Sequence, residues 1–139
     1  MKKIFWAVLF LLLSASGMAF GGEATCTGPS YLKNGASAYS WALTQANASG
    51  ARVSIPDYQD RTIQVAGAFD SATIVIQGSN DGSNWVTLND TTGTALSRSA
   101  AFLAGILENP RYIRPYFASP GASTSVTVTL VGVNSARLR

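Results

Sequence analysis

The chain has 139 residues, of which 47% are hydrophobic and only 12% are charged. This length suggests one domain, and the composition is sufficient for a substantial hydrophobic core. There is no histidine, so Ser-His-Asp and Cys-His chemistry are excluded, and the commonest general base and metal ligand is missing. The single cysteine, Cys26, cannot form an internal disulfide, which leaves a free thiol or a link between two chains.

The formal net charge is +3, but the basic residues are spread along the chain. A nucleic-acid groove usually shows clustered Lys and Arg among aromatic residues, and only residues 111–116 approach that pattern. No nucleic-acid partner is therefore expected.

The first 24 residues have the three-part form of a secretory signal. A positively charged start precedes the apolar run 4–13, which is too short to span a bilayer comfortably. Small residues permit cleavage after Ala19 or Ala24, which predicts an exported protein. A retained membrane anchor and a start at Met18 are the alternatives.

The rest of the chain has the pattern of short strands separated by turns. Residues 25–38 are rich in turn formers and without periodicity, which predicts a flexible arm before a domain at 39–139. Within that domain, alternating or β-branched segments predict about seven strands, at 39–44, 52–55, 62–66, 72–77, 85–88, 112–117 and 125–130. Their spacing of roughly 8–12 residues is typical of an antiparallel β-sandwich or jelly roll.

Two segments carry more specific expectations. One short helix is predicted through 100–107, capped by Ser97 or Ser99, because its large apolar side chains fall on one helical face. Pro115 is predicted at a sheet edge or a bulge, since proline cannot donate to a strand ladder.

The stretch Gly78–Leu88 predicts a β-hairpin with a polar tip and a tryptophan on its return strand. Asn80, Asp81 and Trp85 could form a sugar-binding surface there, because sugar sites use exposed rings with polar neighbours. The alternative is that Trp85, like Trp41, anchors the core or its rim.

A second candidate site is the extended segment that carries Arg111, Arg114 and Tyr116. The arginines could pair with Glu108 or with an acid on a neighbouring subunit. Arg and Tyr are enriched at interface cores, so this segment is predicted to contact another protein rather than a small anion.

The aspartates occur in turn-like contexts, where their side chains usually cap the local backbone, and we expect no catalytic pair among them. Two positioned carboxylates could in principle run glycoside hydrolysis. Asn80-Asp81-Gly82 lacks the further alternating oxygen ligands of a calcium loop, so neither a metal nor a cofactor is expected.

Three blocks in order carry a resemblance, at Tyr58–Phe69, Gly78–Leu88 and Glu108–Pro115, closed by the alternating Thr/Val strand. Over about residues 39–133 the chain resembles small β-rich structural, head-decoration-like proteins of tailed bacteriophages. The hairpin block alone is also similar to that of discoidin-type carbohydrate- and lipid-binding sandwiches. The phage resemblance implies a virion location, whereas the signal-like segment implies that such a domain is reused in an exported surface or filament protein.

Together these features predict a non-enzymatic structural or assembly protein that acts through protein–protein contacts with its own or other subunits. The alternative is an exported carbohydrate-binding module that uses Trp85 and the loop tips.

Overall fold

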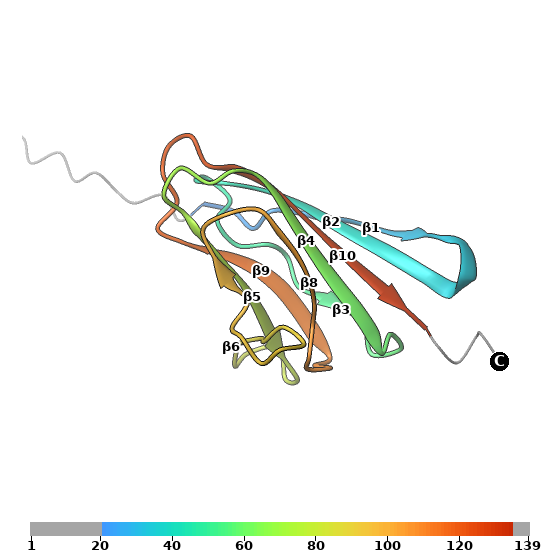
Figure 1. Cartoon of the computed structure of the whole chain (residues 1–139). Coiled ribbons are helices and arrows are strands. Elements are labelled where there is room, and N and C mark those ends of the chain that lie inside the picture. The colour runs from blue at the N-terminus through green and yellow to red at the C-terminus, as the bar shows by residue number, and fades with distance from the viewer. Residues whose placement is uncertain (1–20, 135–139) are drawn as a thin grey trace, which may run out of the picture.

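The computed structural model describes residues 21–134, whose ten strands form two antiparallel sheets packed face to face (Figure 1). The first sheet has the order β1-β2-β10-β4-β8, with β1 Cys26–Tyr31, β2 Ala36–Thr44, β10 Ser125–Val133, β4 Asp60–Ala68 and β8 Phe102–Gly105. The second has the order β3-β9-β5-β6, with β3 Val53–Ser54, β9 Tyr112–Ala118, β5 Thr73–Ser79 and β6 Val86–Thr87. A further strand, β7 Ser97–Arg98, also pairs with β5, and a 3-10 turn, Lys33–Gly35, joins β1 to β2. The predicted antiparallel β-sandwich is confirmed.

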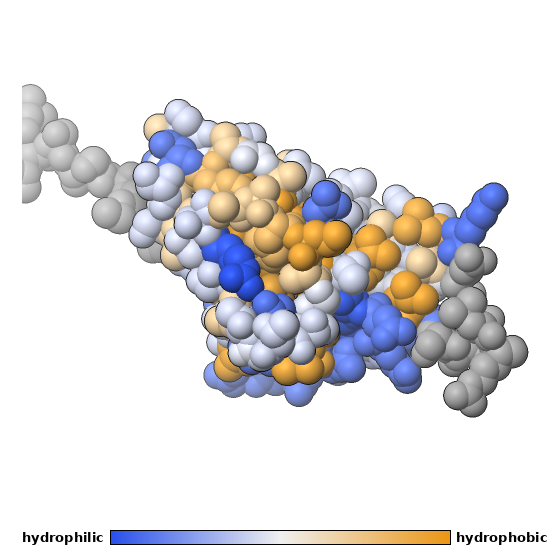
Figure 2. Space-filling view, in the orientation of Figure 1, coloured by the Kyte–Doolittle hydropathy of each residue, from blue (hydrophilic) through white to orange (hydrophobic). Residues whose placement is uncertain are grey.

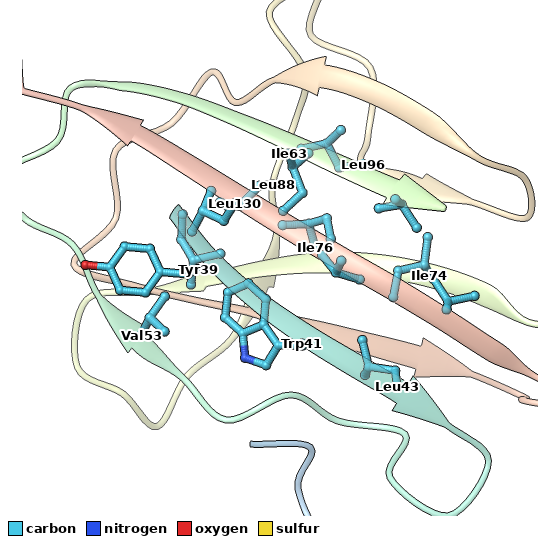
Figure 3. Packing of buried hydrophobic residues seen from close by; sticks show 14 of the residues in the cluster. Tyr39, Trp41, Leu43, Val53, Ile63, Ile74, Ile76, Leu88, Leu96 and Leu130 are labelled. Atoms are coloured by element: carbon cyan, nitrogen blue, oxygen red, sulfur yellow. The ribbon is translucent and has the colours of Figure 1, made fainter. Parts of the chain in front are cut away.

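Alternation of apolar and hydroxyl side chains builds the core of the first sheet. Trp41 of β2 lies directly opposite Val128 of β10, which in turn lies opposite Val65 of β4. All three side chains are buried, and the Trp41 indole N–H donates to the carbonyl of Ala51 at 2.8 Å. Each such aliphatic side chain contributes about 1.5–3 kcal/mol on burial. Figure 3 shows Trp41 with Ile74 and Ile76 of β5 in the cluster of buried side chains.

The predicted helix through 100–107 is wrong, because Phe102–Gly105 forms β8 and pairs with β4. A helix of eight residues is marginal on its own, whereas strand pairing satisfies the exposed edge of β4. The expected helical face is broken accordingly: Ile106 is buried, but Leu103 and Leu107 are 70% and 52% exposed. Figure 2 shows apolar surface over β4 and β8 on this side of the molecule.

The segment 25–38 is also more regular than expected for an arm. Cys26–Tyr31 pairs with β2 as an edge strand, and β2 itself begins at Ala36. The turn-forming residues Gly28 and Pro29 occupy an irregularity in this pairing, where the register shifts between Thr27 and Ser30. The segment Cys26–Tyr31 forms a strand although its sequence has no alternating pattern, because β2 offers backbone groups with which it can pair.

The edge position expected for Pro115 is wrong, since β9 lies between β3 and β5. β3 reaches only Tyr112 and Ile113, so Pro115 lies beyond its end. There the neighbouring backbone is Ala48–Gly50, and the Gly50 N–H donates to the Pro115 carbonyl at 2.9 Å. The proline is thus accepted where one neighbour of the strand is irregular.

The predicted signal segment falls almost entirely on residues 1–20, outside the described residues. Within residues 21–134, the structure has no helix with the length and apolar character needed to cross a membrane.

Candidate functional site: an arginine–aromatic face

The outer side of the second sheet carries a run of aromatic and arginine side chains. Along β9 the side chains alternate, so Ile113 and Phe117 are buried while Tyr112, Arg114 and Tyr116 face away from the core. We call this outer surface the arginine–aromatic face; it consists of Arg52, Trp85, Arg111, Tyr112, Arg114 and Tyr116.

At one end of the face, two guanidinium groups share one ring. The Arg52 and Arg111 guanidinium carbons each lie 5.0 Å from the centroid of the Tyr112 ring. Arg52 also donates from Nη1 to the carbonyl of Gly82 in the hairpin tip, at 3.2 Å. Cation–π contacts contribute about 0.5–1 kcal/mol at exposed sites, so their main effect here is to fix the orientation of flexible side chains.

In the middle of the face, Arg114 is held on two sides. Its guanidinium carbon lies 4.1 Å from the centroid of the Trp85 ring. Its Nε donates to Oε1 of Gln77, the residue directly opposite on β5, at 3.0 Å. Partial burial lowers the pKa of Arg114, an effect opposed by the nearby Glu23 and Tyr116.

Hydrogen bonds to the Asp81 carboxylate organise the hairpin tip between β5 and β6. One carboxylate oxygen, Oδ1, accepts the backbone N–H groups of Ser83 and Asn84 and the hydroxyl of Ser79, all within 2.9 Å. The other oxygen accepts the side-chain amide of Asn84 at 2.7 Å. These hydrogen bonds, led by the Asn84 backbone N–H, hold the pKa of Asp81 well below its usual range.

A side-chain hydrogen bond also fastens this tip to the residue that precedes β9. The Asn80 Oδ1 accepts the backbone N–H of Arg111 at 3.0 Å. The hairpin is therefore joined to the face at both Arg111 and Arg52, and the predicted hairpin with a polar tip is confirmed.

Arg61 supports the face from inside the molecule. It is only 3% exposed, and its guanidinium donates to three carbonyls, those of Tyr58, Ile55 and Pro110, at 2.7–2.9 Å. Burial lowers the pKa of this arginine. Pro110 directly precedes Arg111, and the Ile55 N–H donates to the Arg111 carbonyl. By binding the carbonyls of Pro110 and Ile55, Arg61 therefore holds in place both the residue before Arg111 and the residue that binds the Arg111 carbonyl.

The structure places the six residues singled out in the sequence on the face or in the adjoining hairpin tip: Asn80, Asp81, Trp85, Arg111, Arg114 and Tyr116. Trp85 and Arg114 are in contact, and Asn80 binds the backbone of Arg111. Tyr116 lies farther along the same outer side of β9 and is 39% exposed. Asp81 acts through the tip rather than by contact with the arginines.

The suggested pairing of Arg111 or Arg114 with Glu108 is wrong. The Glu108 carboxylate instead accepts the backbone and side-chain N–H groups of Asn89, at 2.8 and 2.6 Å. Trp41 is a core anchor, as expected, whereas Trp85 is half-buried at the surface.

Sequence reasoning missed Arg52, Tyr112 and Arg61 as site residues. Extending the alternation of Ile63 and Val65 back by two positions places Arg61 on the buried face, so that signal was present. No local pattern predicts the contact of Arg52 with Tyr112, because it depends on the pairing of β3 with β9.

Two further aspartates, Asp70 and Asp90, bind the backbone of nearby turns. Asp70 accepts the backbone N–H of Ser123, and Asp90 accepts Thr92 and Thr94 and pairs with Arg98 at 2.9 Å. The hydroxyl of Thr92 is the main cause of a lowered pKa at Asp90. Across residues 21–134, no three acidic or cysteine side chains come together as a metal site.

A groove of about 510 Å³ lies beside the tip, between the β5–β6 hairpin and the segment 108–110. Its polar lining consists mainly of amides and carboxylates, from Asn80, Asp81, Asn84, Glu108 and Asn109. Such groups donate to and accept from hydroxyl groups.

The fold and this surface define a class: an antiparallel β-sandwich with an exposed arginine–aromatic face. No protein-family model and no curated protein sequence matches the chain.

Proposed function

We propose that the protein is a non-enzymatic structural or assembly module that acts through protein–protein contacts at the arginine–aromatic face. The supporting observation is the arrangement of Arg52, Arg111 and Arg114 against Tyr112 and Trp85 on one exposed sheet face. Trp, Tyr and Arg are the residues most enriched among those that dominate binding energy in protein interfaces.

Pre-organisation strengthens this argument. Arg114 is restrained by Trp85 and Gln77, and Arg52 by Tyr112 and Gly82. An ordered side chain loses less conformational entropy when a partner binds, by about 0.5–1.5 kcal/mol for each. The face is therefore suited to recognition rather than to solubility alone.

The resemblance to head-decoration-like phage proteins supports an assembly role in a virion, and the signal-like segment supports an exported surface or filament subunit. In a virion or in an exported filament, the arginine–aromatic face would contact neighbouring subunits of the assembly.

Carbohydrate binding is the second candidate, and the groove beside the hairpin tip favours it. Its amides and carboxylates, including those of Asn84 and Glu108, have the chemistry that sugar hydroxyls require. Trp85 is less suited to stack on a sugar than an uncovered ring, because Arg114 already contacts it.

Density-gradient fractionation of the native source, with intact mass on each fraction, tests the assembly role. We expect wild-type protein to sediment with particles or filaments, and the double variant Arg111→Gln, Trp85→Ala to move to the soluble fractions. A processed, soluble wild-type monomer whose Trp fluorescence changes with a polysaccharide would contradict assembly and support the groove.

A further inference from the structure

Three arginines of the arginine–aromatic face have no carboxylate partner within residues 21–134. The ion pair that the structure contains there is Arg98 with Asp90, at a different place. Glu23 is close enough to raise the pKa of Arg114 but does not form an ion pair with it. Arg52, Arg111 and Arg114 therefore concentrate positive charge on one sheet face.

Most hydrogen-bond donors of these groups remain available. A guanidinium carries five N–H donors. Arg114 uses Nε on Gln77, and Arg52 uses Nη1 on Gly82. The contact found for the Arg111 side chain is the ring of Tyr112. Guanidinium groups held in this way are suited to bidentate binding of carboxylates.

The geometry of β9 suggests how such carboxylates would be spaced. Tyr112, with its two guanidinium groups, and Arg114 are two positions apart on one strand, or about 7 Å. Alternate side chains of an extended peptide have the same spacing. Acidic residues at every second position could therefore meet both arginine groups at once.

A second copy bound through the same face is disfavoured. A two-fold interface places identical surfaces against each other, which would bring the three arginines of each copy together. Nucleic acid is disfavoured as well, because the acidic side chain of Glu23 lies beside Arg114.

We propose that the arginine–aromatic face binds an extended, carboxylate-rich segment of a different protein, with Asp or Glu at alternating positions. This inference rests on the proposed contact role and specifies the chemistry of the partner. The aromatic rings of Trp85 and Tyr112 hold the guanidinium groups in place for such a segment.

The test uses the full-length, isotope-labelled protein and a short peptide of alternating Glu and Ser. Titration followed by NMR should shift the indole N–H of Trp85 and the amides of β9, and added salt should weaken binding. Arg111→Gln and Arg114→Gln should each weaken binding about two- to fivefold. Lys33→Gln, which removes the same charge from the exposed turn between β1 and β2, should leave it unchanged. Arg111 is exposed, so its variant keeps the fold even if Arg114→Gln does not.

Equal binding of a Gln-Ser peptide would overturn the inference, as would the same shifts with duplex DNA or a heparin fragment. Absence of peptide binding would also overturn it. If the double variant Arg111→Gln, Trp85→Ala nevertheless leaves the particle fractions, the contact role stands and only the acidic partner is wrong.

Discussion

The two tryptophans of the sandwich should respond very differently to truncation. Trp41 is 1% exposed and its indole N–H is bonded to Ala51, so Trp41→Ala creates a cavity and leaves a carbonyl without its donor. The expected loss in the free energy of unfolding is about 4–6 kcal/mol, from the cavity and the hydrogen bond together. Trp85 is half-buried and contacts Arg114, so Trp85→Ala removes roughly 100 Å² of buried surface, or about 1–2.5 kcal/mol.

Urea unfolding followed by far-UV circular dichroism measures both values without depending on tryptophan fluorescence. Trp85→Phe is the matched control, because it keeps a ring beneath Arg114 and should recover most of the loss. If Trp85→Ala destabilises the protein as much as Trp41→Ala, then Trp85 is a core residue and its place in a binding face is wrong.

Three further changes test the supports of the face. Arg61→Met should lower the free energy of unfolding by about 3 kcal/mol, measured by urea titration, because buried carbonyls lose their donors; a neutral effect would show that Arg61 does not hold Pro110 in place. Hydrogen bonds lower the pKa of Asp81, so its stabilising effect is complete above the ordinary value of 3.8 and is lost as the pH falls through that value toward the folded-state pKa. Asp81→Asn should remove this part of the pH dependence between about pH 5 and pH 2, and an unchanged pH profile would refute the role of Asp81 in the tip. Gly82 has φ of +77°, and an added Cβ would meet the Arg52 guanidinium. Gly82→Ala should therefore lower the free energy of unfolding by about 1–2 kcal/mol and shift the ring resonances of Tyr112 in NMR spectra. Unshifted Tyr112 resonances would show that Arg52 does not lie over this ring.

The alternating strands could be predicted from the sequence because one buried face imposes a period of two. Ser125–Val133 is the clearest case, and its Val126, Val128 and Leu130 side chains are buried as the alternation requires. The segment Phe102–Gly105 could not be assigned in this way, since its apolar residues fit both a short helix and an edge strand. Its conformation is decided by pairing with β4, which no local pattern contains.

The candidate site also combines parts that the local sequence predicts with parts that depend on strand pairing. The hairpin tip and the β9 segment could each be found from residue types, because turn formers and interface residues have local signatures. Their convergence depends on the pairing of β5 with β9, which places Gln77 opposite Arg114. Arg52 joins the site for a similar reason, since it directly precedes β3, which pairs with the start of β9. The three segments meet only because of the order of strands in the sheet, and that order could not be predicted from the sequence.

Site-specific photo-crosslinking in the native source tests the contact role most directly. A photoreactive phenylalanine derivative at Tyr116 lies on the exposed arginine–aromatic face, and the same group at Thr127 lies on the exposed side of β10 in the other sheet. We predict a discrete crosslink to another protein from position 116 and none from position 127. Crosslinks to protein from position 127 alone, or none from position 116, would contradict the assignment of this face as the contact surface.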